Sequence, residues 1–374
     1  MRRIGRLAVL AIAVLAIAGC AAPTPSDDVA TDASCAGADA RLIDLDLADD
    51  PRAVVGPSSA CLPSRGIDVV DDTTAAALPV TVTDAEGREV EITDADRILP
   101  VDISGTIAAT VFALGLGEQV VGRDSSTDFA GTEDLPIVTK TGHTLNAEVI
   151  LELAPTIMLT DTTIGPKEVR QQLRDAGIAV VVISSERRLD DVDALVTEVA
   201  AALGVPTRGE ALIADLDADV ADARAEVAEV APAAASDRPR MLFLYVRGSA
   251  NVYYIFGSDS GADSLIDAVG GVDVASEIGW QGMKPMTAEA LVAANPDLLV
   301  MMTDGLASVG GIDGLIQTIP AIAQTPAGEK RRVVDMADTA ILSFGPRSGD
   351  IIRALARAVY APSLGAAPTA APTP

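Results

Sequence analysis

Two segments of the chain repeat one pattern, and this repetition constrains the fold more than any other feature. Residues 145–159 and 286–300 align without a gap, 141 positions apart. Each segment has a polar residue that can start a helix, a helix-like stretch, a proline and an apolar run typical of a buried strand. A second pair of segments, beginning at Ser104 and Ser260, matches in the same order with one deletion. Two matches in one order favour two duplicated units.

Strand-like and helix-like patterns alternate from Leu78 onward. The segment "PVTVTDAEGREVEIT" has the alternation and the turn of a hairpin, and the apolar runs "RILPVDI", "PTIMLT" and "IAVVVIS" follow with helical segments between them. We expect Ser104 and Asn146 to cap the first two helices and "QVVGRD" to form a short strand. Continuous apolar runs suit strands covered on both faces, so the sequence predicts parallel sheets packed between helices.

One long helix is expected between the two units, over residues 206–231. Apolar or small residues recur there at helical spacing, and neither glycine nor proline interrupts the pattern after Gly209. At 1.5 Å per residue the helix would be about 30–35 Å long. The predicted fold class is therefore α/β, with two Rossmann-like lobes, residues 78–205 and 237–361, joined by this helix.

The N-terminus has the features of a bacterial lipoprotein signal. Three arginines in the first six residues precede an apolar run from Leu7 to Ala18, which is too short to remain as a membrane span. The run continues into "LAIAGC", which fits a lipobox in which Cys20 receives the lipid. We expect residues 1–19 to be a signal peptide and Cys20 to anchor the chain at the outer face of the cell membrane. An ordinary signal peptide or a core helix is the alternative.

Residues 20–77 are expected to form a flexible tether and then a small extension held by a disulfide. The two remaining cysteines, Cys35 and Cys61, suit one bridge in an oxidising compartment, and two unpaired thiols are the alternative. A bridge that closes a loop of roughly 25 residues would stabilise the fold by about 3 kcal/mol in the chain-entropy model. The tail, residues 362–374, is rich in Ala, Pro and Thr, and we expect it to be disordered.

The composition excludes several classes of function. The chain has 54 acidic and 27 basic residues, a net charge of −27, so it repels nucleic acid and anionic lipid surfaces. Hydrophobic residues make up 49% of the chain, which is typical of a globular protein, and we expect a monomer. With a single histidine, no P-loop, no zinc-type cluster and no cysteine outside the N-terminal region, we expect a binding protein rather than an enzyme.

Two residues in predicted loops have side chains that bind iron. His143, in "KTGHT", precedes a helix, and Tyr245 lies near the end of the first strand of the second unit, where parallel strands present residues to a ligand crevice. A neutral imidazole and a phenolate are both iron ligands. Arg247 shares a strand face with Tyr245 and favours its phenolate by charge and hydrogen bonding. The alternatives are a surface histidine and a tyrosine whose ring packs in the core.

Other residues are weaker candidates for ligand contact. Tyr253 and Tyr254 point to opposite faces of an extended strand, so one of them can pack on a flat ligand while the other joins the core. Met283 can flank the ligand, although core packing is the alternative. Arg123 and Arg347 lie in predicted loops, where they can meet carboxylates of the ligand or remain solvated.

Four stretches give the chain a family resemblance: "LPVDISGT", "VVGRDSSTDF", "TKTGHTLNAE" and "LYVRGSANVYYIFG". From Leu78 to Tyr360 the chain resembles the cobalamin, siderophore and haem class of substrate-binding proteins from ABC importers, with lobes of the class III periplasmic-binding-protein type. Within that class it is most similar to actinobacterial haem-binding lipoproteins. The resemblance implies haem as the transported ligand, held between the lobes by His143 and Tyr245 as axial ligands with support from Arg247.

The resemblance also implies partners and alternatives. Delivery would be to an ABC permease and its ATPase, and an acidic residue on each lobe, Glu148 and Glu289, would dock against arginines of the permease. Placement in the first turn of a helix, where the dipole favours a carboxylate, is the other explanation for these two residues. A siderophore or cobalamin carrier remains open, because such a carrier needs no axial ligand. An extracytoplasmic sensor domain is the alternative from another class.

Overall fold

The computed structural model describes residues 38–64, 66–140 and 143–364. The expected signal peptide, Cys20 and Cys35 lie outside these residues, as does most of the expected tail. The first three residues of that tail are described, and they form a short 3-10 helix, η8 (Pro362–Leu364), rather than disordered chain. Within the described residues, none of the helices combines the length and apolar character needed to cross a membrane.

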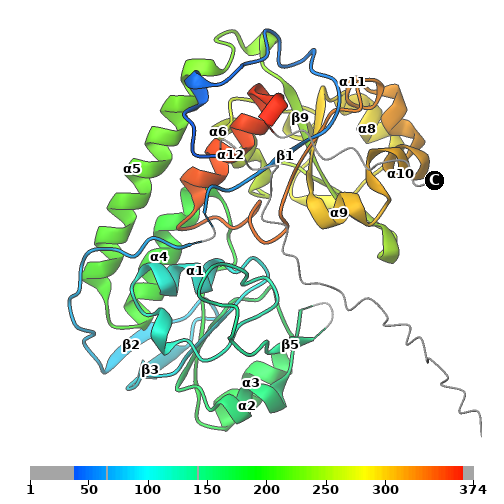
Figure 1. Ribbon diagram of the computed structural model, residues 1–374. Helices are drawn as coiled ribbons and strands as arrows, with labels where there is room; N and C mark the ends of the chain where they lie inside the picture. Colours follow the sequence, from blue (N-terminus) through cyan, green and yellow to red (C-terminus); the bar gives the residue numbers. More distant parts are fainter. Residues whose placement is uncertain (1–37, 65, 141–142, 365–374) are drawn as a thin grey trace, which may run out of the picture. The chain divides into compact units, whose positions relative to one another are not determined.

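The first lobe contains a parallel sheet with the strand order β4-β7-β8, as the apolar runs predicted. Every residue of β4 and β7 is buried, because helices cover the sheet (Figure 1). The expected hairpin is present as β2 and β3, and a small pair, β5 and β6, flanks the loop that carries His143. The elements are β2 (Val80–Thr83), β3 (Glu89–Ile92), β4 (Ile98–Val101), α1 (Thr106–Ala113), η3 (Gly117–Gln119), β5 (Thr139–Lys140), β6 (Thr144–Leu145), α2 (Ala147–Leu153), β7 (Ile157–Thr160), α3 (Lys167–Asp175), β8 (Ala179–Val182), η4 (Leu189–Asp191) and α4 (Val192–Ala202).

The second lobe contains a larger sheet with the order β1-β14-β13-β9-β10-β12, and β11 pairs with β9. Strand β10 is antiparallel to both of its neighbours, β9 and β12, while the other pairs are parallel. The elements are β9 (Arg240–Arg247), η6 (Gly248–Ala250), β10 (Val252–Phe256), α6 (Ala262–Ala268), β11 (Val272–Asp273), α7 (Val274–Glu277), β12 (Met283–Pro285), α8 (Ala288–Ala294), β13 (Leu298–Met302), α9 (Thr303–Ala307), α10 (Gly311–Thr318), η7 (Pro320–Gln324), α11 (Pro326–Glu329), β14 (Val333–Met336) and α12 (Ser348–Tyr360).

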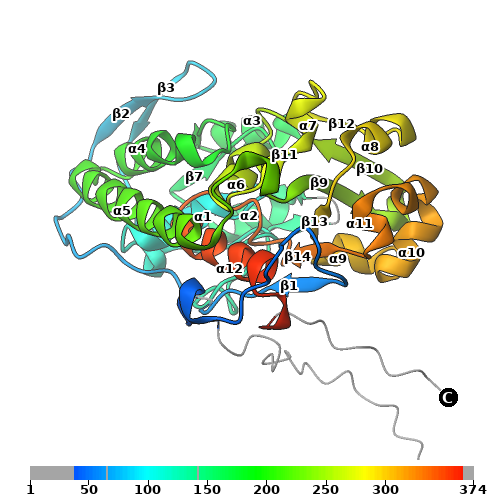
Figure 2. The same cartoon turned by 90° about the horizontal axis from the view of Figure 1, so that it is seen from above.

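The long helix between the lobes is α5 (Pro206–Val230), within one residue of the predicted range. Leu212, Leu216, Ala223 and Val227, which define its apolar stripe, are all buried. Helix α5 packs against α4 of the first lobe and along α12 of the second (Figure 2). The stripe thus spans both lobes, as expected of a helix whose stability depends on tertiary packing.

The N-terminal extension differs from the expectation of a small appendage. It begins with η2 (Leu42–Asp44), and strand β1 (Ser58–Ala60) then adds a parallel edge to the sheet of the second lobe beside β14. Farther on, the amide of Val70 donates to Ala113 O, and the amide of Ala77 donates to Gly204 O, both in the first lobe. The extension therefore contacts both lobes. Weak periodicity hid this strand, because one edge strand of three residues has almost no pattern.

A buried arginine fixes the extension to the second lobe. The Arg332 guanidinium is 1% exposed and donates to Ser58 Oγ (2.7 Å), Ala358 O (2.7 Å), Gly56 O and Val359 O. Burial lowers its pKa to about 10. All four acceptors are neutral oxygens, and two of them are carbonyls at the C-terminal end of α12, where the helix dipole favours a cation.

Of the two cysteines in the predicted Cys35–Cys61 disulfide, the structure describes only Cys61. Cys61 is disulfide-bonded. Its predicted partner, Cys35, lies outside the described residues, so the Cys35–Cys61 pairing stays a prediction.

The duplicated segments fold alike. Helices α2 and α8 each have seven residues and end in a left-handed cap, Ala154 and Asn295, both with φ of 46°. A proline and a buried strand follow in each case, β7 and β13. In the second matched pair, α1 and α6 each begin after a glycine with positive φ, Gly105 and Gly261.

Two details of the helix starts differ from the prediction. Ser104 does not cap α1; instead the carboxylate of Asp102 accepts from the amides of Thr106 (3.3 Å) and Ile107 (3.2 Å). Asn146 occupies the cap position of α2 without a side-chain hydrogen bond to the helix. In addition, "QVVGRD" is not a strand, because only isolated bridges occur in this stretch.

Exchange of the residue types at the two left-handed caps, Ala154 and Asn295, should change the stability of the protein in opposite directions. An alanine in the left-handed region costs about 1 kcal/mol, whereas asparagine adopts that conformation readily. We expect Ala154→Asn to raise the free energy of unfolding by about 0.5–1 kcal/mol and Asn295→Ala to lower it by a similar amount. Urea denaturation measures both. As a control, Ala293→Asn, exposed within α8, should be slightly destabilising because asparagine is a poorer helix former. Stabilisation by the control instead would contradict the argument.

Candidate functional site

Tyr245 lies on strand β9, directly opposite Tyr254 on strand β10. Side chains alternate along a strand, so Tyr245 shares one face of the sheet with Tyr254 and with the paired residues Phe243 and Phe256. The rings of Tyr245 and Phe256 stack with centroids 5.8 Å apart, and those of Phe256 and Phe243 with centroids 4.9 Å apart. Tyr245 is half-buried, so its ring is fixed by this stack while part of it stays accessible.

Arg247 lies on the same face of β9, as the spacing predicted. Its guanidinium carbon is 4.6 Å from the centroid of the Tyr245 ring, which is a cation–π contact. The guanidinium donates to Val246 O (3.0 Å) and to the Asp338 carboxylate (2.5 Å). The same carboxylate accepts from the amide of Asp304, so Asp338 is itself fixed at the end of the sheet. Asp338 thus sets the position of Arg247 over the ring.

His143 lies in the loop between β5 and β6, and its backbone has φ of 60°, an uncommon value for a residue other than glycine. The imidazole is half-buried, and its Nδ1 is 3.4 Å from Ser125 Oγ. Burial lowers the pKa of His143, and the positive charge of Arg247 lowers it further. The imidazole is therefore neutral at pH 7, which is the form that binds a metal.

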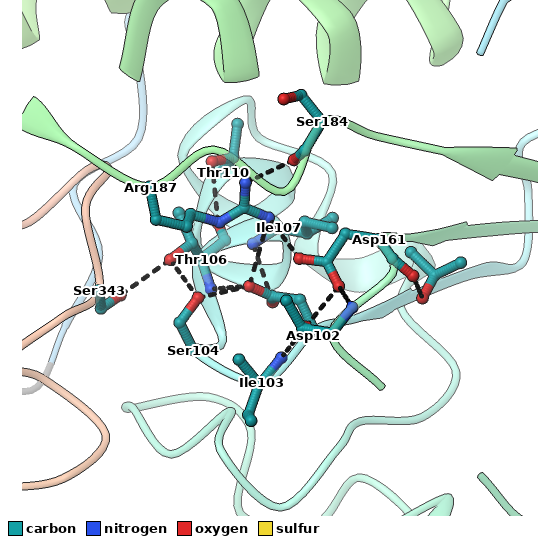
Figure 3. Close-up of polar contacts among 12 residues, drawn as sticks. Asp102, Ile103, Ser104, Thr106, Ile107, Thr110, Asp161, Ser184, Arg187 and Ser343 are labelled. Atoms are coloured by element: carbon teal, nitrogen blue, oxygen red, sulfur yellow. Dashed lines mark hydrogen bonds and ion pairs between the residues drawn. The ribbon is translucent and has the colours of Figure 1, made fainter. Parts of the chain in front are cut away.

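Buried carboxylates lie at the ends of the first-lobe strands, and they fix the loops that follow these strands. Asp102 follows β4 and Asp161 follows β7, and the Arg187 guanidinium lies between them (Figure 3). One guanidinium nitrogen is 2.8 Å from Asp161 Oδ2 and 3.7 Å from Asp102 Oδ2, while another donates to Ser184 O. Both carboxylates are 0% exposed. One arginine therefore links the ends of three strands.

A third buried carboxylate, Asp124, adds negative charge to the same place. Its Oδ2 accepts from the amide of Asp102, and its Oδ1 accepts from the amides of Ser126 and Thr127. Burial and the charge of Asp102 raise the pKa of Asp124 to about 7. The pKa of Asp161 is also raised, by burial and by Asp102. The carboxyl group of Asp124 is therefore partly protonated near neutral pH.

The loop that carries Arg187 also contacts the second lobe. The next residue, Arg188, pairs with Asp259 (2.7 Å) and Asp263 (3.5 Å), and the amide of Leu189 donates to Ser264 Oγ (3.3 Å). A side chain at Gly261 would clash with Arg187 O, because a Cβ there would lie 2.3 Å from that oxygen. This close approach requires glycine at the start of α6.

The other candidate contacts divide between the two faces of the second-lobe sheet. Tyr254 shares the face of Tyr245, whereas Tyr253 packs in the core on the opposite face, beside Trp280 and Met286. Met283 pairs with Phe256 across β12 and β10, so it lies on the Tyr245 face, and it is 55% exposed. An exposed methionine beside two tyrosines suits a flat apolar ligand.

The two candidate arginines are engaged with neighbouring protein groups. Arg123 donates to Thr127 O (2.7 Å), which closes its own loop. Arg347 is 7% exposed, with its guanidinium carbon 5.8 Å from the centroid of the Phe129 ring. Contact with a ligand carboxylate stays a prediction for both.

The two candidate docking residues, Glu148 and Glu289, are exposed and lie in the first turns of α2 and α8. Their repeat positions are therefore equivalent in structure as well as in sequence.

Sequence reasoning missed the residues that support the site. Asp102, Asp161 and Asp338 each follow a parallel strand, β4, β7 and β14, so the rule that located Tyr245 could have found them. Ser125 and Arg187 had no such signal, because loop folding alone brings Ser125 to His143 and Arg187 to its two carboxylates.

The buried carboxylates predict an unusual pH dependence of stability. Because the pKa of Asp124 is raised above its unfolded value, the folded state holds its proton more tightly, and this stabilisation is lost as pH rises from about 4 to about 7. We expect Asp124→Asn to make the decline in unfolding free energy over that range shallower, by up to about 1.4 kcal/mol per pH unit. Denaturant unfolding at pH 4.5 to 7.5, chosen as roughly this window, measures the slope. The exposed variant Glu118→Gln should keep the wild-type slope, and an unchanged slope in Asp124→Asn would refute the assignment.

Comparison with known proteins places the fold and the site in context. A family model described as "Periplasmic binding protein" matches residues 101–340. An ABC transporter substrate-binding lipoprotein of Bacillus subtilis (strain 168), YvrC, described as uncharacterized, is 24% identical over 286 residues, which is 75% of this chain and 86% of that protein. A cobalamin-binding protein of Halobacterium salinarum is 26% identical over 250 residues, 66% of this chain and 65% of that protein.

Two solved structures have a higher sequence identity to this chain than these two relatives have. The haem-binding protein HmuT is 41% identical with a TM-score of 0.78, over 83% of this chain and 99% of that one. Its solved variants replace an arginine, a histidine and a tyrosine, and the tyrosine and arginine are two positions apart. The periplasmic haem-binding protein RhuT from Roseiflexus sp. RS-1 is 38% identical with a TM-score of 0.63, over 71% of this chain and 98% of that one. With two α/β lobes joined by a long helix and a family match over most of both lobes, the chain belongs to the periplasmic binding protein family of ABC-transporter substrate-binding proteins.

Proposed function

We propose that this chain binds haem outside the cytoplasm and delivers it to an ABC importer for iron acquisition. The observation that carries the proposal is the Arg247 guanidinium 4.6 Å from the centroid of the Tyr245 ring, and the half-buried imidazole of His143, whose pKa is lowered in part by Arg247, supports it. The variants made in HmuT concern the same three residue types, with the same spacing between tyrosine and arginine. A haem iron has two axial positions, and an imidazole and a phenolate are both ligands that such an iron takes.

Each residue has a separate part in holding the haem iron. With Nδ1 of His143 3.4 Å from Ser125 Oγ, Nε2 is the nitrogen that would be free to bind the iron, and the lowered pKa favours the neutral imidazole that such a bond requires. The phenolate of Tyr245 supplies a negative charge to ferric iron. The guanidinium of Arg247, held by Asp338, would place a positive charge beside the iron-bound phenolate.

The face of the second-lobe sheet supplies the apolar contact. Tyr254 and Met283 share the Tyr245 face and are accessible enough to contact a porphyrin. Arg123 and Arg347 are the cations we assign to the propionates. Both would then exchange contacts with their own loops for contacts with the ligand.

We further infer that the mature chain begins at a lipidated Cys20 after removal of residues 1–19. A Cys35–Cys61 disulfide would close the start of the extension. Partners would be an ABC permease and its ATPase, and the chain would act as a monomer. Related substrate-binding proteins include one described as a lipoprotein.

Cobalamin is the second candidate ligand. It is favoured by one observation, the 26% identity to a cobalamin-binding protein. The higher identity to haem-binding proteins and the paired iron ligands favour haem instead. The absorption spectrum separates the two, because only haem would give a tyrosinate charge-transfer band.

Titration with hemin tests the ligand and the axial residues. The wild-type protein should develop a Soret band with charge-transfer features of ferric tyrosinate. Tyr245→Ala should weaken binding more than His143→Ala, because an anionic phenolate stabilises ferric iron more than a neutral imidazole does. Arg247→Ala should shift the spectrum without removing the tyrosine ligand, because the phenolate loses its neighbouring positive charge.

Tyr253→Phe is the matched control, because its ring packs on the opposite face of the sheet, and it should leave the spectrum unchanged. If His143→Ala and Tyr245→Ala both keep the wild-type spectrum, the axial assignment is wrong. A flat hemin titration beside tight cobalamin or siderophore binding would replace haem with that ligand.

We propose that Glu148 and Glu289 dock against cationic residues of the permease. Reversal of both charges, Glu148→Lys with Glu289→Lys, should abolish haem uptake by cells while hemin binding by the purified protein is kept, because a docking contact acts through charge complementarity with the partner. Uptake of radiolabelled or fluorescent haem and a Soret titration measure the two effects. Weakened hemin binding, or normal uptake, would mean that these residues are ordinary helix-start carboxylates.

A further inference from the structure

Helices α2 and α8 each expose a large apolar side chain at the same repeat position. Leu151 on α2 is 37% exposed and Val292 on α8 is 39% exposed. The two residues are separated by the repeat offset that separates Glu148 from Glu289. Among the exposed large apolar residues of the described chain, these two alone form an equivalent pair, and neither belongs to a hydrophobic cluster.

Comparison of the two helices shows which exposed positions keep their chemistry. The position of Glu148 and Glu289 is acidic in both, and the position of Leu151 and Val292 is aliphatic in both. The next exposed position is not kept, because Glu152 in α2 corresponds to Ala293 in α8. A single exposed apolar residue is normal on a protein surface, so the informative feature is that an aliphatic residue recurs at the same position, three residues after the repeated glutamate, in both lobes.

Each aliphatic residue lies three positions after its glutamate. On a helix, residues three apart are neighbours on one face, so every lobe presents a carboxylate with an apolar side chain one turn away. Leu151 and Val292 are exposed, whereas the preceding residues Ile150 and Leu291 are buried in the cores of their lobes. Both pairs therefore point away from the cores of their lobes.

We propose that Leu151 and Val292 are paired apolar anchors that bind two equivalent recesses on the ABC permease, each beside a cation that receives Glu148 or Glu289. This inference rests on the proposed docking function and extends it from charge pairing to apolar contact. A duplicated acidic and apolar pair fits a partner with two-fold symmetry, in which each half offers one cation and one apolar recess. A second copy of this chain is a poor occupant, because the glutamates of two such faces would repel.

The two kinds of contact differ in their response to salt. Charge pairing at the edge of an interface weakens as ionic strength rises, whereas burial of an apolar side chain does not. Loss of the aliphatic side chains should therefore weaken docking at low and at high salt alike. Loss of the glutamates should weaken it mainly at low salt.

The test uses the full lipidated chain and the permeases of the haem and cobalamin class from its own organism, each reconstituted with its ATPase in lipid nanodiscs. The double variant Leu151→Gln with Val292→Thr keeps side-chain size and adds no charge. We expect about five- to tenfold weaker binding to one permease, at both roughly 50 mM and 500 mM salt, as apolar burial of two partly exposed side chains predicts. Glu152→Ala, at the position that is not kept, is the matched control and should bind as the wild type does.

Three further readouts decide between explanations. Hemin binding by the double variant should equal that of the wild type, which shows that the fold and the ligand site are intact. Wild-type affinity in the double variant would overturn the inference, as would a dimer of the free chain that dissociates on substitution. If the chain docks through these residues but binds no hemin, the inference stands and the haem assignment fails.

Discussion

The ion pair between Arg187 and the buried carboxylates of Asp102 and Asp161 is the constraint on which the rest of the structure depends. Removal of a charge from water is costly, and these groups are buried together only because one guanidinium compensates two carboxylates that also accept backbone amides. The ion pair fixes the ends of β4 and β7 and the loop after β8. Asp102 also begins α1 through its amide hydrogen bonds, so the pair sets both the strand ends and the first helix.

The same loop makes contact with the second lobe, and three connections join the two lobes in all. Arg188 pairs with Asp259, helix α5 packs on both lobes, and the N-terminal extension runs from a strand of the second-lobe sheet to the first lobe. The buried Arg332 holds the extension in place. Lobes that share a helix, an ion pair and the N-terminal extension have less freedom to hinge than lobes joined by flexible strands.

The chemistry of the proposed site depends on a balance of charge that no single residue provides. Burial and the charge of Arg247 lower the pKa of His143, and the same guanidinium lies over the ring of Tyr245, so one cation is close to the tyrosine and favours the neutral imidazole. Asp338 pairs with Arg247 and holds its guanidinium at the end of the second-lobe sheet. The left-handed backbone at His143 is a strained conformation, of the kind that surrounding structure maintains where a side chain must be aimed.

The amino-acid sequence by itself determined the local structure and the residue types of the site. Apolar runs specified the strands of both lobes, the uninterrupted helical pattern specified α5, and the 141-residue offset specified the duplicated units, because each depends on short-range periodicity. The rule that ligand sites lie at strand ends selected Tyr245 and Arg247 for the same physical reason. Only the tertiary structure decided the contacts between segments that are distant in the chain. It placed strand β1 in the second-lobe sheet and brought Arg187 to Asp102 and Asp161. It also paired Asp338 with Arg247 and put Tyr254, rather than Tyr253, on the sheet face of Tyr245. Sequence patterns carry no information on such contacts, because register and loop folding bring those residues together only after the sheets and helices have packed.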